Sequence, residues 1–419
     1  MTDNEIGQIR LIGERNDHAA YEIRDFFERS VVKFEWIELA SDDDCRRVLD
    51  IENLSNADLP VVEMSDGTRL CAPSLRDVAR KLGFVTEPRR SEYDLSIYGA
   101  GPAGLSAAVY AASEGLSVVL VERGAVGGQA GTTSMIENYL GFPDGIAGAD
   151  LAERARQQAL KFGVEILMMR EGIKARFEDG KIVADLAGGD QMIARSNICA
   201  TGVDWRRIGL DREGDFLGRG IYYGAGVSEA PLCVDEDVCI VGGGNSAGQA
   251  VMHLADHAKS VTMLVRGEAL AASMSDYLIG RIENAGNVTV KYNSEIVGLD
   301  GDTSLSKIRV AEKDKSEVWR DTKRLFVAIG GVPHTEWAKD TPIVRDERDY
   351  MVTGPDLMKD GAWPEAWPLE RAPHFLETSV PGSFAAGDVR HRSIKRVATA
   401  AGEGAMAVAF VHRYLQDAG

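Results

Sequence analysis

A glycine-rich turn constrains this chain more than any other feature of its 419 residues. The apolar run 95–98 leads into Gly99-Ala100-Gly101-Pro102-Ala103-Gly104. We expect a helix over 105–113 and then a strand over 117–121 that ends at Glu122. With this G-x-G-x-x-G spacing, the glycines allow a tight turn, close approach of a pyrophosphate and close helix–strand packing. A carboxylate at position 122 can accept hydrogen bonds from a ribose. The unit therefore predicts a dinucleotide site.

The same plan recurs in the second half of the chain. The strand 237–241 leads into Gly242-Gly243-Gly244-Asn245-Ser246-Ala247, a helix is expected over 248–258, and the strand 260–265 ends at Arg266. In both copies a helix, a strand, a three-stranded meander and a closing strand follow, which indicates an internal duplication. Two such folds imply two nucleotides. Arg266 suits a 2′-phosphate, so NADPH is favoured over NADH at the second site.

The C-terminal part adds a strand that ends in Gly387-Asp388, followed by the start of a long helix at 395–404. A carboxylate at a strand end can accept hydrogen bonds from the ribityl hydroxyls of a flavin. A helix N-terminus near the flavin ring would stabilise the negative charge of the reduced form. These features predict that the first nucleotide is a flavin nucleotide.

Residues 1–85 read as a separate small α/β domain, joined to the rest by a polar linker over 86–92. The order of its strands and helices resembles a glutaredoxin or thioredoxin fold, with Pro60 at the position of the cis-proline of that fold. A redox-active member would carry Cys-x-x-Cys where the first strand meets the first helix, but residues 13–18 contain no cysteine. We therefore expect a docking or packing module without dithiol chemistry.

Composition excludes several classes of function. The net charge of −18 and the absence of a basic stripe argue against nucleic acid and anionic membranes as partners. No apolar run is as long as a membrane span, and the acidic, polar start does not read as a signal peptide. Five scattered cysteines, an odd number, read as reduced thiols in a cytoplasmic protein. No metal site is predicted.

Taken together, the motifs resemble the low-molecular-weight thioredoxin reductase family of flavoproteins, from about Tyr93 to the C-terminus. The resemblance implies an α/β fold with two Rossmann-like domains, each with a β-meander, and a homodimer. The FAD domain would comprise 93–217 and 329–419, and the NADPH domain 218–328 would be inserted into it. Gly218-Arg219-Gly220 and Gly330-Gly331 would be the hinges about which the inserted domain rotates.

The resemblance also implies site residues. For FAD these are Gly99, Gly101, Pro102, Ala103, Gly104, Glu122, Arg123, Gly127, Gly128, Gln129, Asn138, Ala200, Thr201, Gly202, Gly387, Asp388, Lys395, Arg396, Val397 and Ala398. For NADPH they are Gly242, Gly244, Asn245, Ser246, Ala247, Arg266 and Gly330.

The sequence departs from the family pattern in two places. The family carries Cys-x-x-Cys after the first hinge, but the segment 220–233 has only Cys233, and the next cysteine is too far along the chain to form the motif. The space that the missing cysteines leave near the flavin would be filled by Tyr222 or Tyr223, or would stay open. Members also carry several arginines after the strand that ends at Arg266, whereas Gly267 and Ala271 stand here; Arg281 would help if its helix points to the site.

The sequence leaves three functions open. The first is an FAD-dependent NADPH oxidoreductase of thioredoxin reductase type, with a protein or small-molecule acceptor that the sequence does not identify. A reductase of this kind could also resemble the ferredoxin/flavodoxin–NADP⁺ reductases, which lack the dithiol but extend beyond the final helix. The second is a thioredoxin-disulfide reductase that uses thiols of a partner. The third is a flavin redox switch without catalytic turnover.

Overall fold

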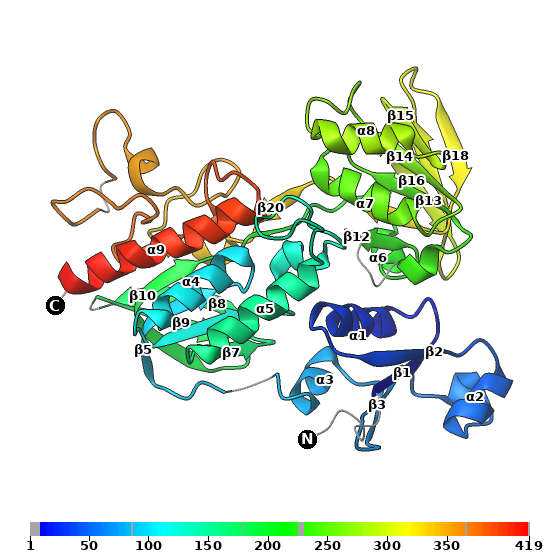
Figure 1. Ribbon diagram of the computed structural model, residues 1–419, viewed down its shortest axis with the longest axis horizontal. Coiled ribbons are helices and arrows are strands. Elements are labelled where there is room, and N and C mark those ends of the chain that lie inside the picture. The colour runs from blue at the N-terminus through cyan, green and yellow to red at the C-terminus, as the bar shows by residue number, and fades with distance from the viewer. Residues whose placement is uncertain (1–8, 85–86, 179, 225–229, 365–366, 418–419) are drawn as a thin grey trace. The chain divides into compact units, whose positions relative to one another are not determined.

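The computed structural model describes residues 9–84, 87–178, 180–224, 230–364 and 367–417 (Figure 1). Contacts divide the chain into two compact units. The first unit contains the residues up to Leu82, Thr132–Met135 and Trp205–Gly330. The second contains Gly83–Gly131, Ile136–Asp204 and the residues from Gly331 onward. Within the described ranges, no helix combines the length and the apolar character needed to cross a bilayer.

The second unit is built on a seven-stranded sheet. Five strands are parallel in the order β7-β6-β5-β10-β21, and β9 and β8 continue from β10 as an antiparallel meander. The apolar runs of β6 and β7 are nearly continuous and buried, as expected of parallel strands that are covered on both faces. The bounds are β5 Glu92–Tyr98, β6 Val118–Glu122, β7 Glu165–Met168, β8 Gly172–Glu178, β9 Lys181–Leu186, β10 Gln191–Cys199 and β21 Ser383–Ala385.

Three helices complete this unit: α4 (Pro102–Ser113), α5 (Gly148–Lys161) and α9 (Val397–Asp417). In Figure 1, α9, drawn in red, runs along α4, and α4 also packs against α5. The Ser106 Oγ donates to the carbonyl of Ala401 at 2.7 Å, which fixes α9 against α4 at the start of both helices. The described residues between β20 (Gly331–Pro333) and β21 are mostly irregular, with two short 3-10 turns at Glu336–Ala338 and Gly354–Leu357.

The first unit holds the second glycine turn on a five-stranded parallel sheet in the order β12-β19-β13-β14-β15. A three-stranded antiparallel meander, β16-β17-β18, follows it in the chain. The strands are β12 Ile221–Tyr223, β13 Asp237–Val241, β14 Ser260–Val265, β15 Val288–Tyr292, β16 Glu295–Gly301, β17 Leu305–Ala311, β18 Glu317–Asp321 and β19 Leu325–Val327. The helices are α6 Glu213–Phe216, α7 Asn245–Ala255 and α8 Asp276–Asn284. The two predicted dinucleotide folds are thus confirmed.

The N-terminal residues of the first unit form a four-stranded sheet in the order β2-β1-β3-β4, in which β1 pairs in parallel with β2 and antiparallel with β3. Its elements are β1 Ile9–Gly13, α1 His18–Arg29, β2 Phe34–Glu38, α2 Asp42–Leu49, β3 Val61–Glu63, β4 Arg69–Cys71 and α3 Leu75–Lys81. Asp17, Ser41 and Ser74 cap the three helices. The Leu59–Pro60 bond is cis. The extra α/β sheet is confirmed, and its thioredoxin-like fold remains a prediction.

The chain crosses between the units at 82–83, 131–132, 135–136, 204–205 and 330–331. The crossings at Asp204–Trp205 and at Gly330–Gly331 are called here the first and the second passage. The two passages run side by side as a two-stranded sheet of β11 (Val203–Trp205) and β20. Phe216 lies just before the predicted hinge Gly218-Arg219-Gly220, is fully buried in an apolar cluster with residues of β12 and β19, and belongs by its contacts to the first unit. The domain bounds and hinges expected from the sequence remain predictions.

Candidate functional site

The first glycine turn is held by backbone contacts that exclude larger residues. Gly99 has φ +98°, and a Cβ on it would lie 2.4 Å from the carbonyl oxygen of Ala200. A Cβ on Gly104 would lie 1.9 Å from the carbonyl oxygen of Gly99. The turn, the start of α4 and the end of β10 are therefore packed as closely as backbone allows, as the sequence motif predicts.

The start of α4 is open to an anion. Gly101 occupies the N-cap position without a side-chain cap, and Pro102 follows at the first helical position. The next backbone N–H groups, those of Ala103 and Gly104, have no partner within the helix because they lie in its first turn. Together with the positive end of the helix dipole, they form an arrangement that suits a phosphate.

Glu122, at the end of β6, is oriented by the turn itself. Its Oε2 accepts a hydrogen bond from the N–H of Ala100 at 2.7 Å, and its Oε1 accepts one from the N–H of Gly124 at 2.9 Å. Each oxygen keeps a further lone pair, so the carboxylate can still accept hydrogen bonds from vicinal hydroxyls of a ribose. The guanidinium of the adjacent Arg123, by contrast, is paired with Asp204.

Asp388 supplies a carboxylate without a partner. No hydrogen bond to its side chain is found in the described part of the chain, and burial raises the pKa of this carboxyl. Lys395 donates to the backbone carbonyl of Asp388 at 3.1 Å. Its positive charge partly offsets the rise in the pKa of the Asp388 carboxyl. A partly buried carboxylate is normally hydrogen-bonded, so this group fits the hydroxyls of a ribityl chain.

Glu403 is a site residue that the sequence reading missed. It lies in α9 and is 6% exposed. Its Oε2 accepts from the N–H of Gly387 at 2.7 Å, and its Oε1 accepts from Arg390 at 2.5 Å. It thereby holds the backbone that carries Asp388. The available signal was a lone acid among Ala400, Gly404 and Ala407 on the buried face of α9.

The structure brings several predicted residues of the first site together. Gly128 faces Gly101, with 3.3 Å between a Cβ on Gly128 and the Cα of Gly101. A Cβ on Gly387 would lie 2.9 Å from the Cβ of Ala103. Gln129 donates to the carbonyl of Val203 at 2.8 Å. Asn138 is exposed and makes none of these contacts. Four separate chain segments therefore meet at the first glycine turn.

The second glycine turn has the same open helix start. Gly244 occupies the N-cap of α7 without a side-chain cap. The loop after β14 closes onto the turn: Ser273 Oγ donates to the carbonyl of Gly243 at 2.8 Å, and Asn245 Oδ1 accepts from the N–H of Ser275 at 2.7 Å. The two serines were missed because nothing in their local sequence marks them. An uncapped helix start of this kind suits a pyrophosphate.

Arg266 lies exposed at the end of β14, as predicted, and none of the described residues pairs with it. Glu268 follows two residues later, is also exposed, and pairs with Lys313 at 3.6 Å. Arg281 lies in the last turn of α8. Of the predicted 2′-phosphate ligands, Arg266 is thus the one whose position at the strand end suits that role.

Both tyrosines that could line a flavin are engaged in the packing of the first unit. Tyr222 is 1% exposed, and its ring lies between those of Phe326 and Tyr21, with centroids 5.3 Å away in each case. The Tyr223 hydroxyl donates to Glu213 at 2.6 Å. These contacts do not favour a role at the flavin. Residues 225–229 of the segment without Cys-x-x-Cys lie outside the described residues.

The cysteines are mostly inaccessible. Cys45, Cys199, Cys233 and Cys239 are buried, and Cys71 is exposed. Burial raises the pKa of Cys199 to about 12 and that of Cys239 to about 11. Because the thiolate is the reactive form, these two groups are inert at neutral pH.

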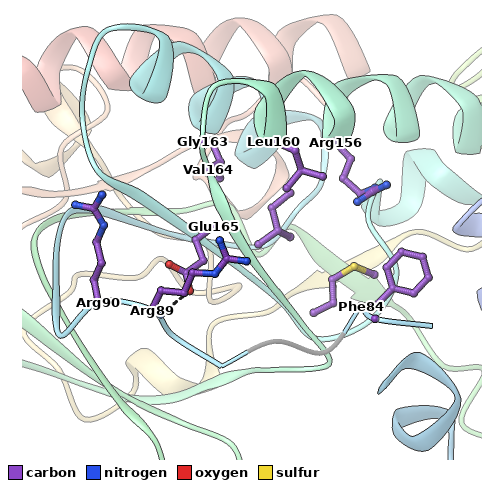
Figure 2. A pocket seen from close by; sticks show the side chains of 11 residues that line it. Phe84, Arg89, Arg90, Arg156, Leu160, Gly163, Val164 and Glu165 are labelled. Atoms are coloured by element: carbon purple, nitrogen blue, oxygen red, sulfur yellow. Dashed lines mark hydrogen bonds between the residues drawn. The ribbon is translucent and has the colours of Figure 1, made fainter. Parts of the chain in front are cut away.

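A separate cavity of about 390 Å³ lies between α5 and β7 (Figure 2). Arg156 stands over the ring of Phe84 at 5.8 Å, and Glu165 accepts a hydrogen bond from the backbone N–H of Arg89 at 2.6 Å. None of the predicted nucleotide ligands lines this cavity. It is therefore distinct from both glycine turns.

Most of this chain is similar in sequence to proteins of one known family. The family described as "Pyridine nucleotide-disulphide oxidoreductase" matches residues 93–404. A thioredoxin reductase from Listeria innocua is 33% identical over 329 residues, which cover 78% of this chain and 94% of that protein. NADPH-dependent thioredoxin reductase 3 from Arabidopsis thaliana is 34% identical over 327 residues, which cover 76% of this chain but 58% of that protein.

The fold agrees with these matches. The crystal structure of Lactococcus lactis thioredoxin reductase is 26% identical, has a TM-score of 0.69, and is matched over 78% of this chain and 99% of that one. The thioredoxin reductase of T. acidophilum has the same identity and TM-score, over 79% and 100% of the two chains. The chain therefore belongs to the low-molecular-weight thioredoxin reductase family and is a flavoprotein oxidoreductase of that type.

Proposed function

We propose that this protein binds FAD at the first glycine turn, takes hydride from NADPH bound at the second, and delivers electrons to an acceptor without a resident Cys-x-x-Cys. The observation that carries the proposal is the unpartnered, partly buried Asp388 carboxylate. It belongs to the same unit as the open start of α4 and the Glu122 carboxylate. A flavin nucleotide carries the three chemical groups that these features suit: ribityl hydroxyls, a pyrophosphate and a ribose.

The residues of the chain would divide the work in a simple way. Backbone N–H groups at the start of α4 would bind the pyrophosphate, Glu122 the adenosine ribose, and Asp388 the ribityl chain. The start of α7 and Arg266 would bind NADPH. When bound, the flavin supplies a ring that accepts hydride and passes on electrons one or two at a time. We further propose that residues 93–217 and 329–419 form the FAD domain, that 218–328 form the NADPH domain, and that the protein is a homodimer.

Anaerobic stopped-flow spectroscopy tests this proposal. NADPH is expected to bleach the flavin of the purified protein within seconds, and NADH to do so less efficiently. Loss of one charge-assisted phosphate contact in Arg266→Ala should lower the efficiency with NADPH by about 10- to 100-fold and leave that with NADH unchanged. Lys259→Ala is the control because Lys259 precedes the opposite end of the same strand. A flavin that stays oxidised for minutes in the wild type contradicts the proposal.

Disulfide reduction with thiols of a partner is the second candidate, and the curated relatives named as thioredoxin reductases favour it. Under native conditions at pH 8, we expect one of the five cysteines to react rapidly with a thiol reagent, because Cys71 is exposed and the others are buried. Cys71→Ser should abolish this fast phase without changing flavin reduction. Two fast thiols in the NADPH-reduced protein, absent from the oxidised one, would instead indicate an internal dithiol.

A further inference from the structure

A cluster of four charged groups lies where the chain passes between its two units. Asp204 is the last residue of the second unit before the first passage, and His334 follows the second passage. The His334 Nδ1 lies 3.0 Å from Asp204 Oδ2, and its Nε2 lies 3.0 Å from Glu171 Oε1. Arg123 pairs with Asp204 and approaches the His334 Nδ1 at 3.4 Å. All four residues belong to the second unit.

Backbone contacts join this cluster to the passages. The N–H of His334 donates to the carbonyl of Gly202 at 3.2 Å, and Thr201 Oγ1 donates to the carbonyl of His334 at 2.9 Å. Beyond them, β11 pairs with β20, and the N–H of Arg206 donates to the carbonyl of Gly330 at 3.0 Å. His334 therefore stands at one end of the ladder that joins the two passages.

The imidazole of His334 has a carboxylate at each ring nitrogen, and only the protonated ring can donate to both. The hydrogen bond to Asp204 raises the pKa of His334, while burial and the Arg123 charge oppose that rise and Glu171 supports it. The pKa of Asp204 is lowered, most strongly by its hydrogen bond from His334 and less strongly by its hydrogen bond from Arg123. The ionic contact is therefore complete below pH 6.5, the ordinary pKa of a histidine. It is lost as the pH rises through the raised pKa of His334 in the folded protein.

We propose that His334 is a positioning residue that, as an imidazolium, ties together β11 and β20, the paired strands at the first and second passages between the units. Release of its proton loosens this crossing. The inference rests on the proposed function in one respect: the inserted NADPH domain is taken to turn about these strands during electron transfer. A change in the stiffness of the crossing then changes the rate of flavin reduction.

Hydrogen exchange of the full-length protein between pH 6 and 9 measures the stiffness directly. The reporters are the amides of Arg206 and His334, corrected for intrinsic exchange and normalised to the amide of Ile97 in the core of the sheet. Their protection should fall by about fivefold as the pH rises, the size of a partly exposed ion pair. His334→Arg keeps a cation at all these pH values, and its protection should stay high. His334→Gln has no charge, and its protection should be low throughout.

His412→Gln is the matched control because His412, on α9, also pairs with an acid, Glu114, which directly follows α4. Its exchange profile should follow the wild type. If His334→Gln does not fold, the pH dependence of protection in the wild type and in His334→Arg still tests the inference. Wild-type protection that is constant with pH, or the same fall in His334→Arg, overturns the inference.

Stopped-flow reduction by NADPH on the same variants gives the functional readout. The wild-type rate should rise with pH relative to that of His334→Arg by about the same factor of five. Equal pH profiles in the two proteins would overturn the link to electron transfer. A flavin that NADPH does not reduce at any pH would contradict the proposed function, and the exchange experiment would still test the ionic tie.

Discussion

Gly404→Ala is expected to yield protein that purifies without FAD and unfolds at lower denaturant concentration than the wild type. A Cβ on Gly404 would lie 2.1 Å from the carbonyl oxygen of Ala103 and 3.1 Å from the N–H nitrogen of Ala107. These neighbours are backbone atoms of α4, so they cannot rotate away, and α9 and the first turns of α4 must move apart. We expect a loss of about 3 kcal/mol in the free energy of unfolding. FAD affinity should fall at least about tenfold, because the displaced turn of α4 is the proposed pyrophosphate site.

Gly402→Ala is the control in the same helix. No atom lies within 4 Å of a Cβ at Gly402, and its backbone is helical. The same substitution should there stabilise the protein by about 0.5–1 kcal/mol, since alanine is the better helix former. Urea denaturation and the ratio of flavin to protein absorbance measure both effects. Equal stability and equal flavin content in the two variants would contradict the close packing of α9 on α4.

Glu403→Ala is expected to have an effect of similar size for a different reason. Glu403 and Arg390 are 7% and 9% exposed at their side chains, so removing the carboxylate leaves a buried guanidinium without its charge partner. Breaking such a pair from one side costs about 3–5 kcal/mol. The N–H of Gly387 also loses its acceptor, so the backbone that carries Asp388 is no longer fixed. FAD retention should therefore fall together with the free energy of unfolding.

Glu403→Gln separates the charge from the shape of this residue. The amide can still accept the hydrogen bond from the Gly387 N–H, but it leaves Arg390 unpaired. We expect Glu403→Gln to lose stability and to retain more FAD than Glu403→Ala. Isothermal titration of the apoprotein with FAD and thermal unfolding give the two quantities independently. Full FAD affinity in Glu403→Ala would show that Glu403 does not position Asp388.

The parts of the fold that follow from local sequence were predicted well. A glycine turn requires particular backbone angles and close approaches at fixed spacing, so Gly99 and Gly104 could be placed from the motif alone. The acid and the arginine at the ends of β6 and β14 could be found because a strand ends where its apolar run ends. Because the same order of elements occurs twice, the parallel sheet of each dinucleotide fold could be predicted.

The remaining features depend on contacts between distant segments, which a single sequence does not specify. His334 meets Asp204 across 130 positions and Glu171 across 163. Glu403 acts because α9 lies beside the Gly387 backbone. Phe216 belongs to the first unit because its apolar neighbours Ile221 and Leu325 lie there. The pairing of Arg123 with Asp204, across 81 positions, depends on the same kind of distant contact.

The contact between Ser106 and Ala401 joins residues 295 positions apart and has a consequence for biosynthesis. The strand β21, which completes the main sheet by pairing with β10, and the helix α9 are the last regular elements of the described chain. During translation, the N-terminal sheet and the first unit's second glycine turn can emerge and fold before these elements leave the ribosome. The unit that holds the first glycine turn cannot complete its sheet until then, and the end of β10 that pairs with β21 stays an unpaired edge. Exposure of that edge on the nascent chain makes this unit the part that depends most on rapid completion or on chaperones.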